Sequence, residues 1–221
     1  MKYERALILG ASGGIGSALA DALKPADVVT LSRSEDGFDL LSEASIAGFA
    51  ESIPGPFDLI IDATGALEID GIGPEKSVAA INPEVMARQF AINAIGPALI
   101  FKHFMGHLPK DSPCMLVSLS ARVGSIGDNR LGGWISYRAA KAALNQIIKT
   151  TSIELSRTHK QSICVAIHPG TVKTPLTQKY VGNHPAVTTN EAALNILTVL
   201  SVLDVADTGG FFDWKGDRIE W

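Results

Sequence analysis

The sequence predicts an α/β protein with a single doubly wound, mostly parallel sheet of about six to seven strands flanked by helices. Short apolar runs alternate with helix-like segments along the chain, as expected for parallel strands that are buried on both faces. The first apolar run leads into a cluster of glycines. With 221 residues and 46% hydrophobic content, the chain suits one compact domain, which we place at residues 1–221.

The bulk composition argues against several functional classes. A net charge of −4 and the lack of a long basic run argue against nucleic acid as a partner. No apolar run approaches the length of about 18 residues that a membrane helix needs, and the N-terminus does not resemble a signal peptide. We therefore expect a cytoplasmic protein with no membrane partner. Cys114 and Cys164 lie in apolar, strand-like runs, where we expect buried, reduced thiols.

The N-terminal part of the chain has the pattern of a βαβ unit. A strand at residues 5–9 runs into glycines at 10–16, a helix follows at 17 to about 24, and a second strand lies at 28–32. Glycines let the backbone approach a pyrophosphate, and the helix behind them offers free N–H groups. This context favours a bound dinucleotide over a tight turn without a ligand. The expected binding residues of this turn are Gly10, Ser12, Gly13, Gly14, Ile15 and Gly16.

The residues after the second strand indicate which dinucleotide is bound. An acidic residue there would bind the ribose 2′-hydroxyl of NAD, whereas a basic one would accommodate the 2′-phosphate of NADP. The sequence reads Ser32-Arg33-Ser34, and a guanidinium beside hydroxyls suits a phosphate. Glu35 and Asp36 argue in the opposite direction. We therefore expect NADP(H), with NAD(H) as the alternative.

Residues 37–40 read as a brief extended piece and residues 42–52 as a helix. A further parallel strand beside the second one needs a crossover of about a dozen residues, and only about four are available. The piece is therefore either a vestigial edge strand or an extended loop. Asp39 is a candidate for contact with the adenine amine, or else an ordinary loop or helix-start aspartate.

The next two elements hold Gly65 and Asn93. A buried strand at 57–62 is followed by Gly65, where a cofactor would lie closest to the backbone. After a loop at 68–83, a long helix at 84–108 holds Asn93 in apolar surroundings, where it needs polar partners or bonds nearby backbone. His103 and His107 lie near the end of this helix. We expect dipole-favoured histidines there rather than a metal site.

The second half of the chain continues the alternation of strands and helices. A strand at 115–120 leaves Ser120 at its carboxyl end, where open α/β sheets bind ligands. A loop at 121–133 and a helix at 136–159 follow, and a strand at 162–167 runs into a Pro-Gly turn at 168–176. The last elements are a helix at 191–204 and a strand at 209–214.

Tyr137 and Lys141 lie four residues apart near the start of the helix at 136–159. Residues with this spacing share one helix face, so a phenol and an ammonium are held side by side. The cation favours the phenolate and should lower the tyrosine pKa from its usual value of about 10. Taken alone, the pair also fits an accidental contact on a solvated helix.

With these residues assembled, the whole chain resembles a classical short-chain dehydrogenase/reductase, a family with a Rossmann-type fold. The family's glycine motif, Tyr-x-x-x-Lys pair, helix asparagine and Pro-Gly turn with threonine are matched by Gly10, Gly14, Gly16, Tyr137, Lys141, Asn93, Pro169, Gly170 and Thr174. The stretches 120–126, 132–134 and 211–216 resemble the C-factor-like subgroup.

Three features depart from the family pattern. The usual Asn-Asn-Ala-Gly reads Asp-Ala-Thr-Gly at 62–65. The family's helix between its second and third strands is missing, because only about four residues separate the strand at 28–32 from the extended piece at 37–40. The column of the catalytic serine holds Ala121, with Ser120 one position early and Ser125 as a second candidate. Successive strand residues face opposite ways, so the offset matters. We expect Ser120 to fill the role.

The resemblance implies an NAD(P)(H)-dependent oxidoreductase, with NADPH-dependent carbonyl reduction as the expected reaction. Tyr137 would act as general acid or base, Lys141 would lower its pKa and bond the nicotinamide ribose, and Ser120 would polarise the carbonyl. Asn93 would hold a water that relays protons. Further cofactor contacts are expected from Asp39, Gly65, Pro169, Gly170, Val172 and Thr174.

A small carbonyl or alcohol would be the substrate, and association through the long helices would give a homodimer or homotetramer. The alternative is a non-catalytic dinucleotide-binding sensor or signalling protein of the same fold, which the altered 62–65 stretch and the displaced serine favour. An epimerase or dehydratase of the extended branch would need a sugar-nucleotide domain, for which the C-terminal part leaves no room.

Overall fold

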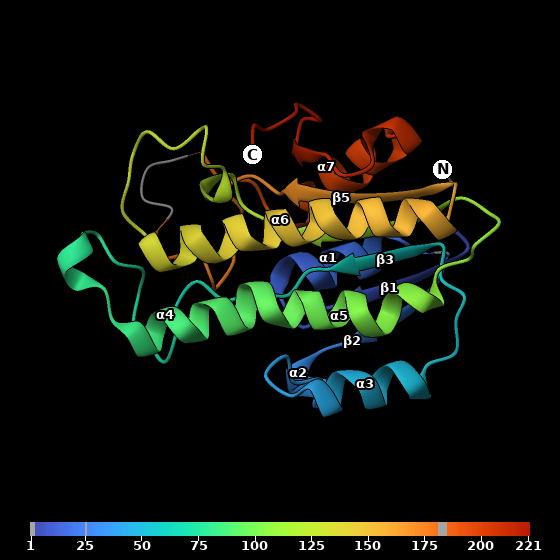
Figure 1. Ribbon diagram of the computed structural model, residues 1–221, viewed down its shortest axis with the longest axis horizontal. Helices are drawn as coiled ribbons and strands as arrows, with labels where there is room; N and C mark the ends of the chain where they lie inside the picture. The colour runs from blue at the N-terminus through green and yellow to red at the C-terminus, as the bar shows by residue number, and fades with distance from the viewer. Residues whose placement is uncertain (1–2, 25, 181–184) are drawn as a thin grey trace.

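The computed structural model describes residues 3–24, 26–180 and 185–221, and its centre is a six-stranded sheet (Figure 1). The strands follow the order β2-β1-β3-β4-β5-β6, and all neighbours pair in parallel. Their bounds are β1 Arg5–Leu9, β2 Asp27–Leu31, β3 Leu59–Asp62, β4 Cys114–Leu119, β5 Ser162–His168 and β6 Phe211–Asp213. The predicted doubly wound α/β class is confirmed.

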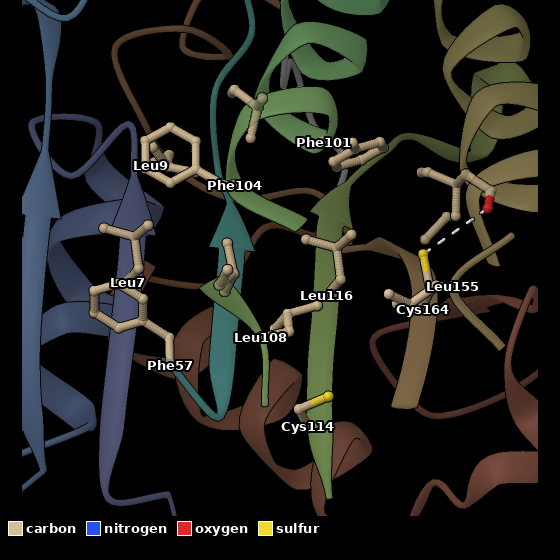
Figure 2. Packing of buried hydrophobic residues seen from close by; sticks show 14 of the residues in the cluster. Leu7, Leu9, Phe57, Phe101, Phe104, Leu108, Cys114, Leu116, Leu155 and Cys164 are labelled. Atoms are coloured by element: carbon tan, nitrogen blue, oxygen red, sulfur yellow. Dashed lines mark hydrogen bonds between the residues drawn. The ribbon is translucent and has the colours of Figure 1, made fainter. Parts of the chain in front are cut away.

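Helices cover both faces of the sheet. One face carries α3 Glu43–Ser52, α5 Gly96–Phe104 and α6 Ile135–Thr158, and the other carries α1 Gly14–Ala22 and α7 Thr189–Val202. Strand side chains fill both interfaces because successive residues point to opposite faces. Figure 2 shows the first interface, with Leu7, Leu9 and Leu116 on the strands and Phe101 and Phe104 on α5.

The long helix predicted at 84–108 is interrupted. α4 Pro83–Phe90 passes through a π segment, Ala91–Ile95, into α5, and a 3-10 turn at Met105–His107 ends the run. Further 3-10 turns lie at Val78–Ala80, Arg122–Gly124 and Val205–Asp207. Side chains cap several helix starts. For example, Ser42 Oγ accepts from Ser45 N–H before α3, and Thr188 and Glu191 form a capping box at α7.

Residues 37–40 form no strand, so the extended-loop alternative is correct. A single-turn helix, α2 Arg33–Asp36, follows β2 and ends at Gly37, where φ is +79°. The chain then passes through the loop to α3. Because a parallel neighbour of β2 would need a longer crossover, the sheet ends at β2.

The two cysteines lie in the core, and His103 and His107 contact α3. Cys114 and Cys164 are free and buried, and burial raises the pKa of their thiols to about 11 and about 12. His103 contacts an α3 carboxylate at 3.1 Å, and His107 contacts an α3 backbone carbonyl at 2.9 Å. Within the described residues, no group of three His, Cys, Asp or Glu side chains could hold a metal ion. No described helix is long and apolar enough to cross a membrane.

The carboxyl ends of the parallel strands lie at one edge of the sheet, toward which the arrowheads of β3 and β5 point in Figure 1. β1 lies between β2 and β3, so the winding of the sheet reverses there. Ligands of open α/β sheets bind in the crevice at such a reversal. Because α6 also begins at this edge (Figure 1), it brings Tyr137 and Lys141 to the same side as the glycine turn.

Candidate active site

The loop between β1 and α1 forms a glycine cradle at the reversal point. Gly10 has φ +85°, and a Cβ there would lie 2.8 Å from the Ala63 carbonyl oxygen. A Cβ on Gly16 would collide with the Gly10 carbonyl, so α1 packs directly on the loop. α1 has Gly13 as its N-cap, with no side chain bonded there. The first N–H groups of α1 therefore fit a pyrophosphate.

A cavity of about 270 Å³ extends from this cradle along the ends of β1, β2 and β3. The predicted cofactor residues that line it are Gly10, Ser12, Gly13, Arg33, Asp39 and Gly65. Ile15 instead packs against the core between α1 and α7. The residues expected for the phosphates and for the adenosine therefore surround one cavity.

Ser32 and Asp36 form a local cap at the end of β2. The Asp36 carboxylate accepts from Ser32 N–H at 2.7 Å and from Ser32 Oγ at 3.2 Å. A carboxylate therefore lies close to the expected position of the ribose 2′-substituent, while the Arg33 side chain is exposed. Asp39 lines the cavity, but its carboxylate also accepts from Leu41 N–H at 3.0 Å, which is an ordinary turn contact.

Asp62 lies at the end of β3 and is fully buried. Its carboxylate accepts from Thr64 N–H at 3.0 Å and from Ser118 Oγ at 2.7 Å. Burial raises the pKa of Asp62, against the lowering effects of the Thr64 and Ser118 hydrogen bonds and of Lys141. This residue therefore ties β3 to β4 and places a buried acid close to the predicted lysine.

Asn93 is fully buried in the π segment and clamps the chain after β3. Its Oδ1 accepts from Ala66 N–H at 3.0 Å, and its Nδ2 donates to the Ala66 carbonyl at 2.8 Å and to Gln89 Oε1 at 2.6 Å. A Cβ on Gly65 would lie 2.9 Å from Asn93 Oδ1 and 3.5 Å from Lys141 Nζ. The backbone at Gly65 therefore passes close to both predicted side chains.

Tyr137 and Lys141 lie one turn apart on α6, as predicted. Lys141 is 4% exposed, and its Nζ donates to the Leu119 carbonyl at 3.0 Å. Burial lowers the pKa of Lys141 to about 8, and Asp62 opposes this shift. Burial raises the pKa of Tyr137 to about 12. The expected lowering of the tyrosine pKa is therefore wrong for this structure. The ammonium of Lys141 bonds the end of β4 rather than the phenol, and burial alone sets the direction of the Tyr137 shift.

Both candidate serines have partners. Ser120 donates to Asn145 Oδ1 of α6 at 2.6 Å, while Ser125 donates to the Glu220 carbonyl and so holds the C-terminal residues. Ser120 directly follows the β4 residue whose carbonyl accepts from Lys141. Ser120 is therefore adjacent in sequence to a residue that the predicted lysine contacts directly.

The Pro-Gly turn after β5 comes back to the glycine cradle. Gly170 has φ +80°, and Val172 is 2% exposed and pairs with Val187. A Cβ on Gly14 would lie 3.1 Å from Thr174 Cγ2. Two predicted cofactor segments that are far apart in sequence are therefore in contact.

Two further features lie in this region. A second cavity of about 200 Å³ lies between residues 66–68 and 175–176. Glu75 is buried, and its carboxylate accepts from Ser136 N–H at 3.2 Å at the start of α6. No spacing in the sequence indicates a contact between residues 61 positions apart.

Comparison with known proteins finds similar sequences over most of the chain. A family model described as short chain dehydrogenase matches residues 37–184. The chain is 29% identical over 191 residues to 1-hydroxy-2-glutathionyl-2-methyl-3-butene dehydrogenase of Rhodococcus sp. (strain AD45), covering 85% of this chain and 80% of that protein. It is 28% identical over 167 residues to the C-signal of Myxococcus xanthus, covering 76% and 94%. The C-signal match gives limited support to the C-factor-like subgroup.

Solved structures share the fold. The NADPH-bound carbonyl reductase from chicken fatty liver has a TM-score of 0.84 and 24% identity, with all of both chains covered. The carbonyl reductase Sniffer of D. melanogaster has a TM-score of 0.85 and 21% identity, with 99% of each chain covered. At these identities the likeness establishes the arrangement of the sheet and helices.

Proposed function

Because the chain belongs to the short-chain dehydrogenase/reductase family, we propose that it is an NADPH-dependent carbonyl reductase acting on small molecules. The nicotinamide would exchange a hydride with the carbonyl or alcohol carbon of the substrate. The observation that carries the proposal is the Tyr137–Lys141 pair on α6, at the same sheet edge as the glycine cradle. The NADPH-bound carbonyl reductase of the same fold supports this choice.

Tyr137 would give its proton to the substrate oxygen in reduction and remove it in oxidation. With a pKa of about 12, the phenol is protonated at neutral pH and suits the acid role. Lys141, with a pKa of about 8, is mostly charged at pH 7. By turning its ammonium from the Leu119 carbonyl toward the phenol, Lys141 would lower the pKa of Tyr137, as the base role requires.

Asn93 and Ser120 would complete the site. Asn93 fixes Ala66 and, with it, the backbone beside Lys141 Nζ. Its π segment is a feature that often marks functional sites. A proton-relaying water would bind beside it. Ser120 would turn its hydroxyl from Asn145 to the carbonyl oxygen of the substrate.

The preference for NADP(H) rests on Arg33. This guanidinium is exposed at the rim of the larger cavity, where it would pair with a 2′-phosphate. Asp36 opposes this preference, but its carboxylate already accepts two hydrogen bonds from Ser32. The exposed guanidinium therefore outweighs the carboxylate that already accepts two hydrogen bonds.

A homodimer or homotetramer is the proposed assembly. α5 and α6 pack together on one face of the sheet (Figure 1). Ile95, just before α5, is 54% exposed, and Ile153 on α6 is 50% exposed. Association through these helices would bury both side chains. Sedimentation analysis measures the assembly directly.

Replacing Tyr137 with phenylalanine tests the proposed reaction. The variant should lose carbonyl-dependent NADPH oxidation by about 10²–10⁴-fold, the usual contribution of a general acid, and keep its affinity for NADPH. A wild-type protein that binds NADPH but oxidises none of it with a panel of aldehydes and ketones would instead be a dinucleotide sensor. Retained turnover in Tyr137→Phe would refute the assignment of the acid.

A further inference from the structure

Three consecutive residues before α6 have a left-handed backbone, and the third is a tryptophan. Gly132, Gly133 and Trp134 have φ angles of +62°, +64° and +53°. Glycine adopts this conformation freely, whereas a bulky side chain there is an outlier. Such strain persists only where the surrounding structure holds it, and it gathers at functional sites.

The loop at 66–82 holds Trp134 in place. The backbone N–H of Trp134 donates to the Glu75 carbonyl. The Glu75 carboxylate accepts from Ser136 N–H at 3.2 Å and from Ser136 Oγ, and Glu75 is only 8% exposed. The backbone carbonyl of Glu75 therefore fixes Trp134, and its carboxylate fixes the first turn of α6.

The indole of Trp134 lies between two tyrosines. Its ring centroid is 6.3 Å from that of Tyr137 and 5.5 Å from that of Tyr180, and both pairs are edge-to-face, with interplanar angles of 67° and 77°. Aromatic pairs favour this geometry at centroid separations of about 4.5–7 Å. The three rings therefore form a continuous aromatic wall that starts at the proposed acid.

The far end of this wall is fixed by Glu68, whose charge is paired. The Tyr180 hydroxyl donates to one carboxylate oxygen of Glu68 at 2.7 Å, and Lys179 Nζ donates to the other at 2.9 Å. A Cβ on Gly73 would collide with the Tyr180 hydroxyl, so a glycine makes room for this ring. Because the charge of Glu68 is paired with Lys179, the wall presents aromatic rings rather than an unpaired charge.

We propose that Trp134 is a specificity-determining residue that selects substrates carrying a flat aromatic ring next to the carbonyl. This inference rests on the proposed function, because it takes Tyr137 as the group that contacts the carbonyl oxygen. Substituents of that carbonyl lie close to the phenol, and the indole is the neighbouring ring of the wall. An aromatic substituent can pair with the indole edge-to-face, whereas a saturated ring of similar size cannot.

Acetophenone and cyclohexyl methyl ketone test this preference. In wild type and Trp134→Gly, kcat/KM is measured for both ketones with NADPH, and comparing the ratios cancels the intrinsic reactivity of each ketone. The aryl-to-alkyl ratio should fall by about 3- to 10-fold in Trp134→Gly, the worth of one aromatic pair. Trp221→Gly is the matched control, because Trp221 stacks on Phe211 at the C-terminus, and it should leave the ratio unchanged.

Two measurements separate this inference from a folding defect and from the proposed reaction. Glycine adopts a positive φ without strain, so Trp134→Gly should melt at or above the temperature of Trp134→Ala while losing the same selectivity. If no aldehyde or ketone of the panel is reduced, the proposed function fails. Calorimetric binding of the two ketones in the presence of NADP⁺ then still tests whether Trp134 favours the aromatic one. An aryl-to-alkyl ratio that is the same in wild type and Trp134→Gly, in turnover or in binding, would overturn the inference.

Discussion

Replacing Lys141 with methionine removes a buried ammonium while leaving most of the apolar side chain in place. Burial lowers the pKa of Lys141 to about 8, against an ordinary value of about 10.4. A difference of roughly 2.5 pKa units corresponds to about 3 kcal/mol. Between pH 8 and 10.4 the unfolded chain binds more protons than the native protein, so this group makes wild type more stable as the pH rises. Below pH 8 the full cost of the buried charge is present.

Urea unfolding of wild type and Lys141→Met measures this difference. At pH 7 the variant should be more stable by up to about 3 kcal/mol, and its advantage should shrink as the pH rises from 8 toward 10.4. Two losses in the variant reduce this gain in unfolding free energy. The hydrogen bond to the Leu119 carbonyl is lost, which costs about 1 kcal/mol, and Asp62 loses a nearby cation. A variant that is less stable than wild type at pH 7, by an amount that does not change with pH, would refute the reasoning.

The order of strands and helices could be predicted because its causes are local. Strands buried on both faces need unbroken apolar runs, and each run between 5 and 213 marks a strand close to its true position. The prediction for α6 differs from the structure by one residue at each end. The glycine cradle is predictable for the same reason, since a Cβ on Gly10 or Gly16 would meet backbone atoms.

The partners of the site side chains could not be predicted, because they depend on which acceptors tertiary packing provides. The spacing of Tyr137 and Lys141 places them on one helix face, but the ammonium bonds a carbonyl at the end of β4, 22 positions away. Burial then decides the direction of the tyrosine pKa shift. Similarly, helix propensity gives no reason for the π segment, in which Asn93 bonds Ala66, 27 positions away.

Four further substitutions test the cofactor preference and the identity of the catalytic serine. Arg33→Ala should lower the preference for NADPH over NADH by about tenfold, through loss of a charge-assisted contact, and a wild type that prefers NADH would contradict this assignment. Ser120→Ala should lower kcat by about 10²–10³-fold, as when one donor to the oxyanion is removed, whereas Ser125→Ala should leave kcat nearly unchanged, because its hydroxyl holds the C-terminal residues. If the bond to Asn145 is the whole role of Ser120, the variant instead loses about 1 kcal/mol of stability and keeps its kcat. Ala121→Ser then distinguishes the two roles of Ser120. It places a hydroxyl at the position of the family's catalytic serine. This hydroxyl should raise kcat above that of wild type only if Ser120 does not already polarise the carbonyl.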